Sequence, residues 1–269
     1  MLTREEFHGR FGAAPLFGMV HLRPLPGSPL FGGSMDAVID GAILSARALA
    51  DGGCAAIIFE NFGDRPFFKT GVPAATVAAM TQAIASTVAA VKVPFGVNVL
   101  RNDAESALAI AAATGASFIR VNVHTGVMLT DQGLVEGSAA GTLRLRATLA
   151  PKVLIFADLL VKHASPLVDT DETQMARDLR TRGLADALIL SGQETGSPAD
   201  RARLETVRAA VDAPLLIGSG VTAENAADYA PADGFIVGTS LKREGRVDGP
   251  VDPKRVIQMA AALRALCGR

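Results

Sequence analysis

The length and charge of the chain already exclude several classes of protein. It has 269 residues, of which 49% are hydrophobic and 20% charged, and its formal net charge at pH 7 is −1. This composition is typical of a well-packed domain and excludes a long disordered chain. Because there is no basic excess to neutralise a phosphate backbone or an anionic lipid surface, we expect no nucleic acid and no membrane surface as the main partner.

The start of the chain does not resemble a targeting signal. Glu5 and Glu6 stand where a signal peptide needs a basic start followed by an apolar core, and no apolar run reaches the ~18 residues of a membrane span. Cys54 and Cys267 lie far apart, and neither belongs to a Cys-x-x-Cys pair. We therefore expect no membrane insertion and a reduced, cytoplasmic setting.

Short apolar runs alternate with longer stretches of helical period, which is typical of parallel βα units. Thr3 and Glu6 come first and have the spacing of a capping box, which predicts a short helix ahead of the first strand. Eight strands are then predicted, at residues 16–21, 54–59, 94–99, 118–123, 153–158, 187–191, 215–218 and 235–238. Most are continuous apolar runs, as expected of strands buried on both faces.

Three of the intervening helices have clear sequence signals. Residues 35–49 carry apolar side chains at intervals of three and four after Ser34, and Gly52 predicts the end of that helix. Ser197 and Asp252 each precede a proline, and this pairing predicts a capped helix start. We place the starts of the seventh-unit helix and the final helix there.

The strand count predicts an α/β fold, namely a single (β/α)8 TIM barrel over residues 1–269 with a short N-terminal helix. An open doubly wound sheet is the alternative for eight parallel strands. It is less favoured, because no G-x-G-x-x-G fingerprint follows the first strand.

Two glycine-containing loops predict a phosphate site. In such barrels the loops after strands seven and eight commonly bind phosphate through backbone amides. Here those loops read Gly218-Ser219-Gly220-Val221-Thr222, with Thr222 placed to cap the next helix, and Gly238-Thr239-Ser240. We predict ligand contacts from Ser219, Gly220, Gly238, Thr239 and Ser240, although such glycines can also serve only to make tight turns.

Polar residues stand at the ends of the other strands, where barrel enzymes carry their reactive groups. These residues are His21, Glu60, Asn98, Asn122, His124, Asp158 and Ser191. Their repeated occurrence after apolar runs indicates a polar site. Asn98, Asn122, His124 and Ser191 are predicted to bind substrate.

Glu60 and Asp158 are the candidate acid and base. They can serve in this way if the site separates their pKa values, or they can jointly hold a divalent cation such as Mg²⁺, together with His21 or an asparagine. The sequence does not decide between these roles. For each carboxylate the structural alternative is a salt bridge or loop cap at the barrel rim.

The loops contribute further candidates. His21, at the end of the first strand, is either catalytic or structural, and Lys162 can steady a phosphate or carboxylate or simply be a solvated loop lysine. A Schiff-base role for Lys162 is disfavoured, because this residue lies beyond the strand. His163 is predicted to contact substrate, and the long loops 61–72 and 125–138 are candidate lids.

Several stretches resemble the BtpA family over nearly the whole chain. They are Gly18-Met19-Val20-His21-Leu22 with Pro24-Leu25-Pro26-Gly27-Ser28-Pro29, Thr130-Asp131-Gln132-Gly133, Phe156-Ala157-Asp158 with Val161-Lys162-His163-Ala164, and residues 232–242 running into Val251-Asp252-Pro253. The resemblance implies a barrel of the ribulose-phosphate-binding type. The family is named for a factor implicated in photosystem I biogenesis and includes members described as sugar- or nucleoside-metabolism proteins, so it implies no single reaction.

Three functions follow as hypotheses. The leading one is an enzyme that isomerises or cleaves a phosphorylated sugar, nucleoside or nucleotide-like metabolite by acid/base chemistry. The alternatives are a non-catalytic biogenesis or stability factor for a membrane complex such as photosystem I, and a regulator that binds a metabolite without turnover. Alanine-rich helices leave a homo-oligomer open.

Overall fold

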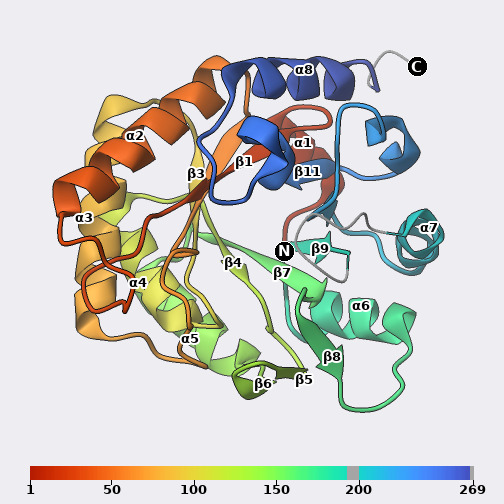
Figure 1. Ribbon diagram of the computed structural model, residues 1–269. Coiled ribbons are helices and arrows are strands. Elements are labelled where there is room, and N and C mark those ends of the chain that lie inside the picture. The colour runs from red at the N-terminus through yellow and green to blue at the C-terminus, as the bar shows by residue number, and fades with distance from the viewer. Residues whose placement is uncertain (193–199, 267–269) are drawn as a thin grey trace.

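Eight parallel strands close into a barrel in the computed structural model, which describes residues 1–192 and 200–266 (Figure 1). Around the barrel the order is β1-β11-β10-β9-β7-β4-β3-β2, and β1 pairs with both β2 and β11 to close it. The strands are β1 (Leu16–His21), β2 (Ala56–Glu60), β3 (Phe95–Asn98), β4 (Phe118–Val121), β7 (Leu154–Leu160), β9 (Ala187–Leu190), β10 (Leu215–Ile217) and β11 (Gly234–Val237). All eight predicted strands and the TIM-barrel fold are confirmed.

Helices surround the barrel (Figure 1). They are α2 (Met35–Asp51), α3 (Ala74–Ala90), α4 (Ala104–Thr114), α5 (Ala139–Leu149), α6 (Glu172–Thr181), α7 (Arg201–Ala210) and α8 (Pro253–Arg264). As predicted, Ser34 caps α2, which ends before Gly52, and Asp252 caps α8. Within the described residues, no helix combines the length and apolar character needed to cross a membrane.

The seventh βα connection differs from the sequence prediction. Thr222 does not cap an α-helix; it exchanges hydrogen bonds with Asn225, ahead of the 3-10 helix η1 (Ala226–Tyr229). A longer helix does not form here, because Pro231 comes two residues after the end of η1 and β11 already begins at Gly234. The predicted helix start at Ser197 lies outside the described residues, and α7 itself begins at Arg201 with Asp200 as its cap.

A second, smaller sheet was not predicted. Strands β5 (Val127–Thr130), β6 (Gly133–Glu136) and β8 (Ala164–Pro166) form an antiparallel sheet in the order β6-β5-β8. The turn between β5 and β6 is closed by the Thr130 hydroxyl, which donates to the carbonyl of Gly133 at 2.9 Å. The segment taken as the long loop 125–138 is therefore mostly a β-hairpin beyond the carboxyl end of β4.

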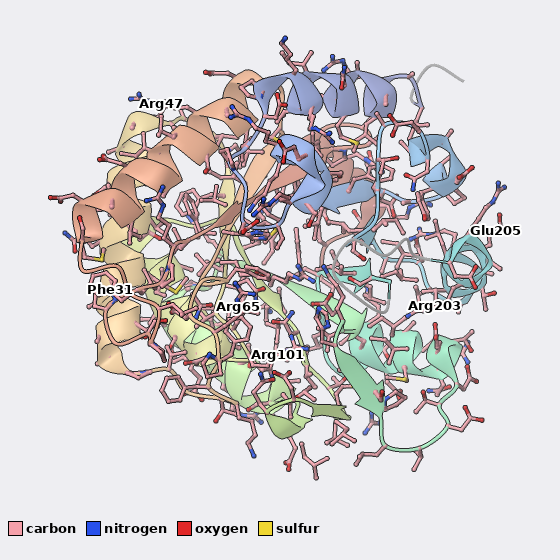
Figure 2. All side chains as sticks on the ribbon, in the orientation of Figure 1. Phe31, Arg47, Arg65, Arg101, Arg203 and Glu205 are labelled. Atoms are coloured by element: carbon pink, nitrogen blue, oxygen red, sulfur yellow. The ribbon has the colours of Figure 1, made fainter. Side chains whose placement is uncertain are left out.

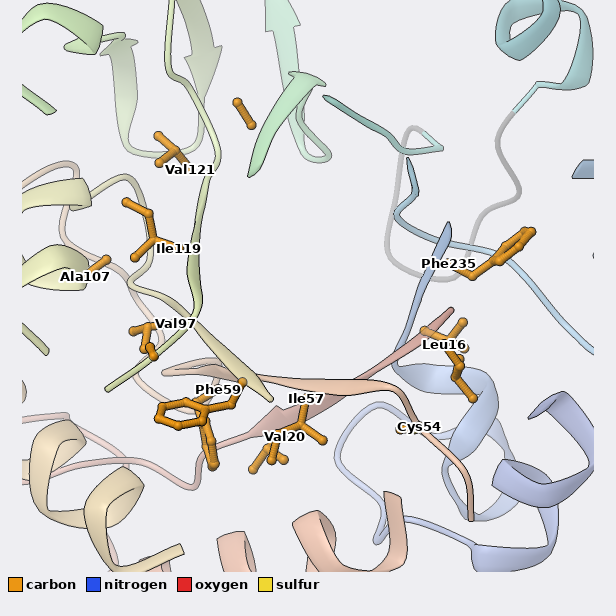
Figure 3. Packing of buried hydrophobic residues seen from close by; sticks show 14 of the residues in the cluster. Leu16, Val20, Cys54, Ile57, Phe59, Val97, Ala107, Ile119, Val121 and Phe235 are labelled. Carbon is orange, nitrogen blue, oxygen red and sulfur yellow. The ribbon is translucent and has the colours of Figure 1, made fainter. Parts of the chain in front are cut away.

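The larger hydrophobic core lies between the barrel and its helices. Because successive side chains of a strand point to opposite faces, every second residue faces outward to this layer. Figure 3 shows Val20, Ile57 and Phe59 of β1 and β2 packed together there, and all three are fully buried.

A separate core fills the inside of the barrel and is closed by the N-terminal helix. Helix α1 (Arg4–Phe11) begins with the predicted capping box of Thr3 and Glu6. It inserts Phe7 and Phe11 against inward-facing strand residues, and Phe118 and Phe156 stack there with their ring centroids 4.4 Å apart. This aromatic layer closes the end of the barrel at which α1 lies.

Candidate functional site

A large pocket opens at the carboxyl ends of the strands, where barrels of this fold carry their sites. Its volume is about 960 Å³. Among the predicted site residues, those that line it are His21, Glu60, Asn122, Lys162, His163, Ser219, Gly220, Gly238, Thr239 and Ser240. The polar strand ends and the two glycine-containing loops therefore face one cavity.

The floor of this pocket is a polar layer that sits directly above the aromatic layer. In β4 the inward positions are Phe118 and then Arg120, and in β7 they are Phe156 and then Asp158. The alternation of strand side chains explains this arrangement, since residues two apart share a face. Each strand thus contributes an apolar residue to the plug and a polar residue to the floor.

Arg120 and Asp158 are the centre of the floor. The guanidinium donates from Nη2 to Oδ1 at 2.8 Å and from Nε to Oδ2 at 3.0 Å. Asn122 adds a bond from Nδ2 to Oδ2 at 2.9 Å, and Asn98 in turn donates to the Asn122 side chain at 3.1 Å. Both oxygens of Asp158 are therefore engaged by donors, and the network fixes the side chains of Arg120 and Asn122.

These contacts do not fit the divalent cation left open for Glu60 and Asp158. A metal ion needs several free oxygen ligands, whereas Asp158 is bound by Arg120, and the charges of Arg120 and Lys162 act on Glu60. Nor do the described residues contain any group of three or more His, Cys, Asp or Glu side chains placed to hold a metal.

Glu60 has an environment suited to proton transfer. It is 6% exposed, and burial raises the pKa of its carboxyl above the ordinary value, although Arg120 and Lys162 act in the opposite direction. Its Oε1 atom lies 3.8 Å from Nε2 of His21. A carboxyl of this kind can hold its proton closer to neutral pH than an exposed glutamate can.

His21 is held between Glu60 and a lysine from the far end of the chain. The Nζ atom of Lys242 lies 2.9 Å from Nδ1 of His21 and also bonds the carbonyl of Val247. Burial and the neighbouring charge of Lys242 lower the pKa of His21 well below its ordinary value. Because an ammonium group only donates, Nδ1 accepts, and the proton of the neutral ring is assigned to Nε2, facing Glu60.

Loop 61–72 covers this part of the pocket. The ring of Phe62 stacks on His21 with the centroids 4.6 Å apart, and the Arg65 guanidinium lies over Phe62 at 5.4 Å from the ring centroid. Figure 2 shows Arg65 and Arg101 lying inward among the loops, in contrast to Arg47 on an outer helix. The stack holds the imidazole plane and shields it from solvent.

The two predicted phosphate loops form the opposite wall. Gly220 has φ +70°, a conformation that favours glycine. The Ser219 hydroxyl accepts a bond from the Gly192 amide at 2.9 Å, and the Ser240 hydroxyl donates to the Val221 carbonyl at 2.6 Å. These bonds tie the loops after β10 and β11 to the rest of the rim. Close packing also requires a glycine at Gly218, since a Cβ there would lie 2.6 Å from Ile189 and Ser191.

Four predicted residues do not line the pocket. Asp158 and Asn98 belong to the polar layer of the floor but are covered from the cavity, and the Ser191 hydroxyl is 3.5 Å from Asp158 Oδ1. His124 lies to one side, where its Nε2 is 2.8 Å from the Gly183 carbonyl. All four lie around the cavity without lining it, and their hydrogen bonds hold the neighbouring residues in place.

Four basic residues of the site, namely Arg101, Arg120, Lys242 and Arg255, were not predicted from the sequence. Arg120 had a visible signal, since it is the one charge within an otherwise apolar strand and shares a face with Phe118 and Asn122. Lys242 belongs to the stretch 232–242, from which the resemblance to the BtpA family was drawn but no site residue beyond Ser240 was predicted. Arg101 follows β3 in a loop, where a basic residue is usually a solvated surface group.

Comparison with known proteins places these features in a family. The sequence model of the BtpA family matches residues 13–265. The photosystem I biogenesis protein BtpA of Synechocystis is 50% identical, and the alignment covers 93% of this chain and 88% of that protein. An uncharacterised protein of Methanocaldococcus jannaschii is 41% identical over 94% of this chain and 98% of its own length.

Solved structures that resemble the chain share its fold. N-(5'-phosphoribosyl)anthranilate isomerase from Pyrococcus furiosus superposes with a TM-score of 0.57 at 13% identity, covering 94% of this chain and 99% of that one. Thiamine phosphate pyrophosphorylase from the same organism gives a TM-score of 0.58 at 14% identity, with 94% and 96% covered. At such identities the likeness extends to the barrel alone.

Proposed function

Since this chain belongs to the BtpA family and has a polar pocket at the catalytic end of its barrel, we propose that it is an enzyme acting on a phosphorylated sugar, nucleoside or nucleotide-like metabolite. The reaction class is acid/base chemistry, that is, an isomerisation or the cleavage of a C–C, C–O or glycosidic bond. Its ligand is a small phosphorylated molecule held at the mouth of the barrel.

One observation carries this proposal. Two glycine-containing loops and a buried carboxyl next to a neutral imidazole face the same cavity, with Gly220 and Gly238 on one side and Glu60 and His21 nearby. Backbone amides at such loops suit a phosphate, because they donate without a side chain in the way. A structural scaffold would gain nothing from a buried ionisable pair beside an open cavity, since burying such groups costs stability.

The residues suggest a division of labour. Glu60, whose pKa is raised by burial, supplies or removes a proton, and His21 donates from Nε2 to a substrate oxygen or to Glu60 itself. Lys162 and Arg120 provide positive charge for an anion that develops during the reaction. Asp158 acts through Arg120 and Asn122, whose positions it fixes.

A thermal-shift screen tests the proposal. Purified protein is heated with inorganic phosphate, sugar phosphates, nucleosides and nucleotides, because a ligand that binds the native state raises the Tm. A phosphorylated compound that raises the Tm and is then consumed in a turnover assay supports the enzyme. Binding without turnover favours the metabolite-binding regulator, and no shift with any phosphorylated compound contradicts the proposal.

A second candidate function rests on a different surface. Leu129 of β5 and Leu134 of β6 pair across the hairpin and are 50% and 44% exposed, respectively. Exposed apolar side chains of this kind suit a protein partner, and the Synechocystis relative is named for photosystem I biogenesis. If this function holds, a Synechocystis strain lacking its own relative regains photosystem I with the Glu60→Gln variant of this chain but not with Leu134→Asp.

A further inference from the structure

The guanidinium of Arg101 lines the pocket and, within the ranges that the structure describes, has one hydrogen-bond donor without an acceptor. The side chain follows β3, lines the cavity and is 6% exposed. Its Nη2 donates to the carbonyl of Lys162 at 2.6 Å, but its Nε has no hydrogen-bond partner within residues 1–192 and 200–266. A buried donor without an acceptor destabilises the folded protein, and more so when the group is charged.

The pocket lining also carries more basic than acidic side chains. Among the described residues that line it, five side chains are basic, namely Arg65, Arg101, Arg120, Lys162 and Arg255, and two are acidic, Glu60 and Asp131. Arg120 is neutralised by Asp158. In the described part of the chain no ion pair includes Arg101 or Lys162. The charges of Glu60 and Asp158 act on both cations, but over the same residues neither cation has a carboxylate in direct contact.

Arg101 lies across the mouth of the barrel from the two glycine-containing loops. Around the ring, β3 stands directly opposite β10, and β4 stands opposite β11. Arg101 follows β3, and the glycine-containing loops follow β10 and β11. A ligand whose phosphate lies on those loops must therefore extend across the mouth of the barrel to reach Arg101.

We propose that Arg101 and Lys162 form a second anion-binding subsite, which takes a carboxylate or a second phosphate at the end of the ligand remote from the phosphate loops. The inference rests on the proposed function, which it narrows to metabolites that carry two anionic groups. A guanidinium binds such groups through charge-assisted hydrogen bonds, and that of Arg101 belongs to the lining of the pocket, where an incoming anion would meet it. Burial lowers the pKa of both side chains, and an anion between them would offset that effect.

Binding of three matched probes tests the subsite by calorimetry. Ribitol 5-phosphate carries the phosphate alone, 5-phosphoribonate adds a carboxylate, and ribulose 1,5-bisphosphate adds a second phosphate. The wild-type protein should bind at least one of the doubly charged probes about tenfold or more tightly than ribitol 5-phosphate, since charge-assisted hydrogen bonds contribute at least that much. Whichever probe binds more tightly identifies the second anion.

Variants locate the effect. Arg101→Gln should reduce the preference for the doubly charged probe to about threefold or less and leave the affinity for ribitol 5-phosphate within about twofold. Lys162→Gln should also reduce the preference for the doubly charged probe, and Arg101→Lys should retain part of it. Arg47→Gln, on the exposed face of α2, is the matched control and should change neither affinity (Figure 2).

The outcomes separate the two proposals. Equal affinity for all three probes, or loss of all binding in equal measure in Arg101→Gln, overturns the subsite and leaves the phosphate site standing. Binding of inorganic phosphate with none of the three probes also overturns the subsite. If the wild-type protein binds neither inorganic phosphate nor any probe, the proposed function fails, and the subsite fails with it.

Discussion

Arg120 and Asp158 form a bidentate ion pair at the floor of the pocket, with Nη2 2.8 Å from Oδ1 and Nε 3.0 Å from Oδ2. The pair joins the neighbouring strands β4 and β7 and is almost inaccessible to solvent, with side-chain exposures of 5% and 0%. Its geometry holds a positive guanidinium directly beneath the ligand cavity.

Removing one partner of this pair should be strongly destabilising. In Asp158→Asn the shape is kept, but the Arg120 charge stays buried without its counter-ion, which costs about 3–5 kcal/mol. Urea unfolding measures the change in the free energy of unfolding. The Arg201–Glu205 pair of α7 is the control, since its side chains are 61% and 53% exposed; Figure 2 shows Glu205 on the outer side of that helix. Glu205→Gln should cost no more than about 1 kcal/mol. Equal losses in the two variants would contradict the buried pair.

Lys162 should reduce the stability of the protein at neutral pH. Burial lowers the pKa of its ammonium group from 10.5 to about 8, so the folded state resists the charge that the unfolded chain carries freely. Lys162→Met keeps an unbranched chain without the charge, and should raise the free energy of unfolding at pH 7 by roughly 1–3 kcal/mol. The advantage should shrink between about pH 8 and pH 10.5, where the wild-type lysine deprotonates first in the folded state. A destabilised variant at pH 7 would contradict this account.

Glu60 should make stability fall as the pH rises. Its pKa in the folded state is raised above 4.5, chiefly by burial, so the unfolded chain releases this proton at lower pH. The contribution of the carboxyl is fully present below pH 4.5 and declines above it, until the folded state also ionises. We therefore expect Glu60→Gln to gain stability relative to the wild type as the pH rises above 4.5, until the carboxyl of the folded wild-type protein also ionises, as measured by urea unfolding. If the difference in the free energy of unfolding between Glu60→Gln and the wild type does not change with pH, the pKa of the Glu60 carboxyl is not raised in the folded state.

The barrel was predictable because its strands are short apolar runs that alternate regularly with longer stretches of helical period. The predicted 153–158 became Leu154–Leu160, and 54–59 became Ala56–Glu60, so the errors were confined to strand ends. The small sheet was missed for the opposite reason. Its strands have three or four residues and exposed positions, and β8 pairs with β5 across more than 30 residues of chain. Such pairing depends on tertiary contacts, which a local pattern does not record.

The site was predictable at the strand ends and less so in the loops. Polar residues after apolar runs identified Glu60 and His21 correctly as pocket residues. The contact of Lys242 with His21 joins positions 221 residues apart, and no spacing in the sequence indicates it. The engagement of Asp158 by Arg120 was foreseen only as the salt-bridge alternative. Which carboxylate is paired and which stays available depends on neighbours that only the folded chain brings together.

The phosphate loops are tested most directly by comparing phosphate binding in Gly220→Asp and Gly220→Asn. Both side chains have nearly the same shape and meet the same cost at φ +70°, so only the negative charge distinguishes them. In a thermal-shift titration, inorganic phosphate and sugar phosphates should raise the Tm of the wild-type protein. Gly220→Asn should retain part of this increase in Tm, and Gly220→Asp should show no increase. Equal responses of the two variants, or no response of the wild-type protein, would contradict a phosphate site at these loops.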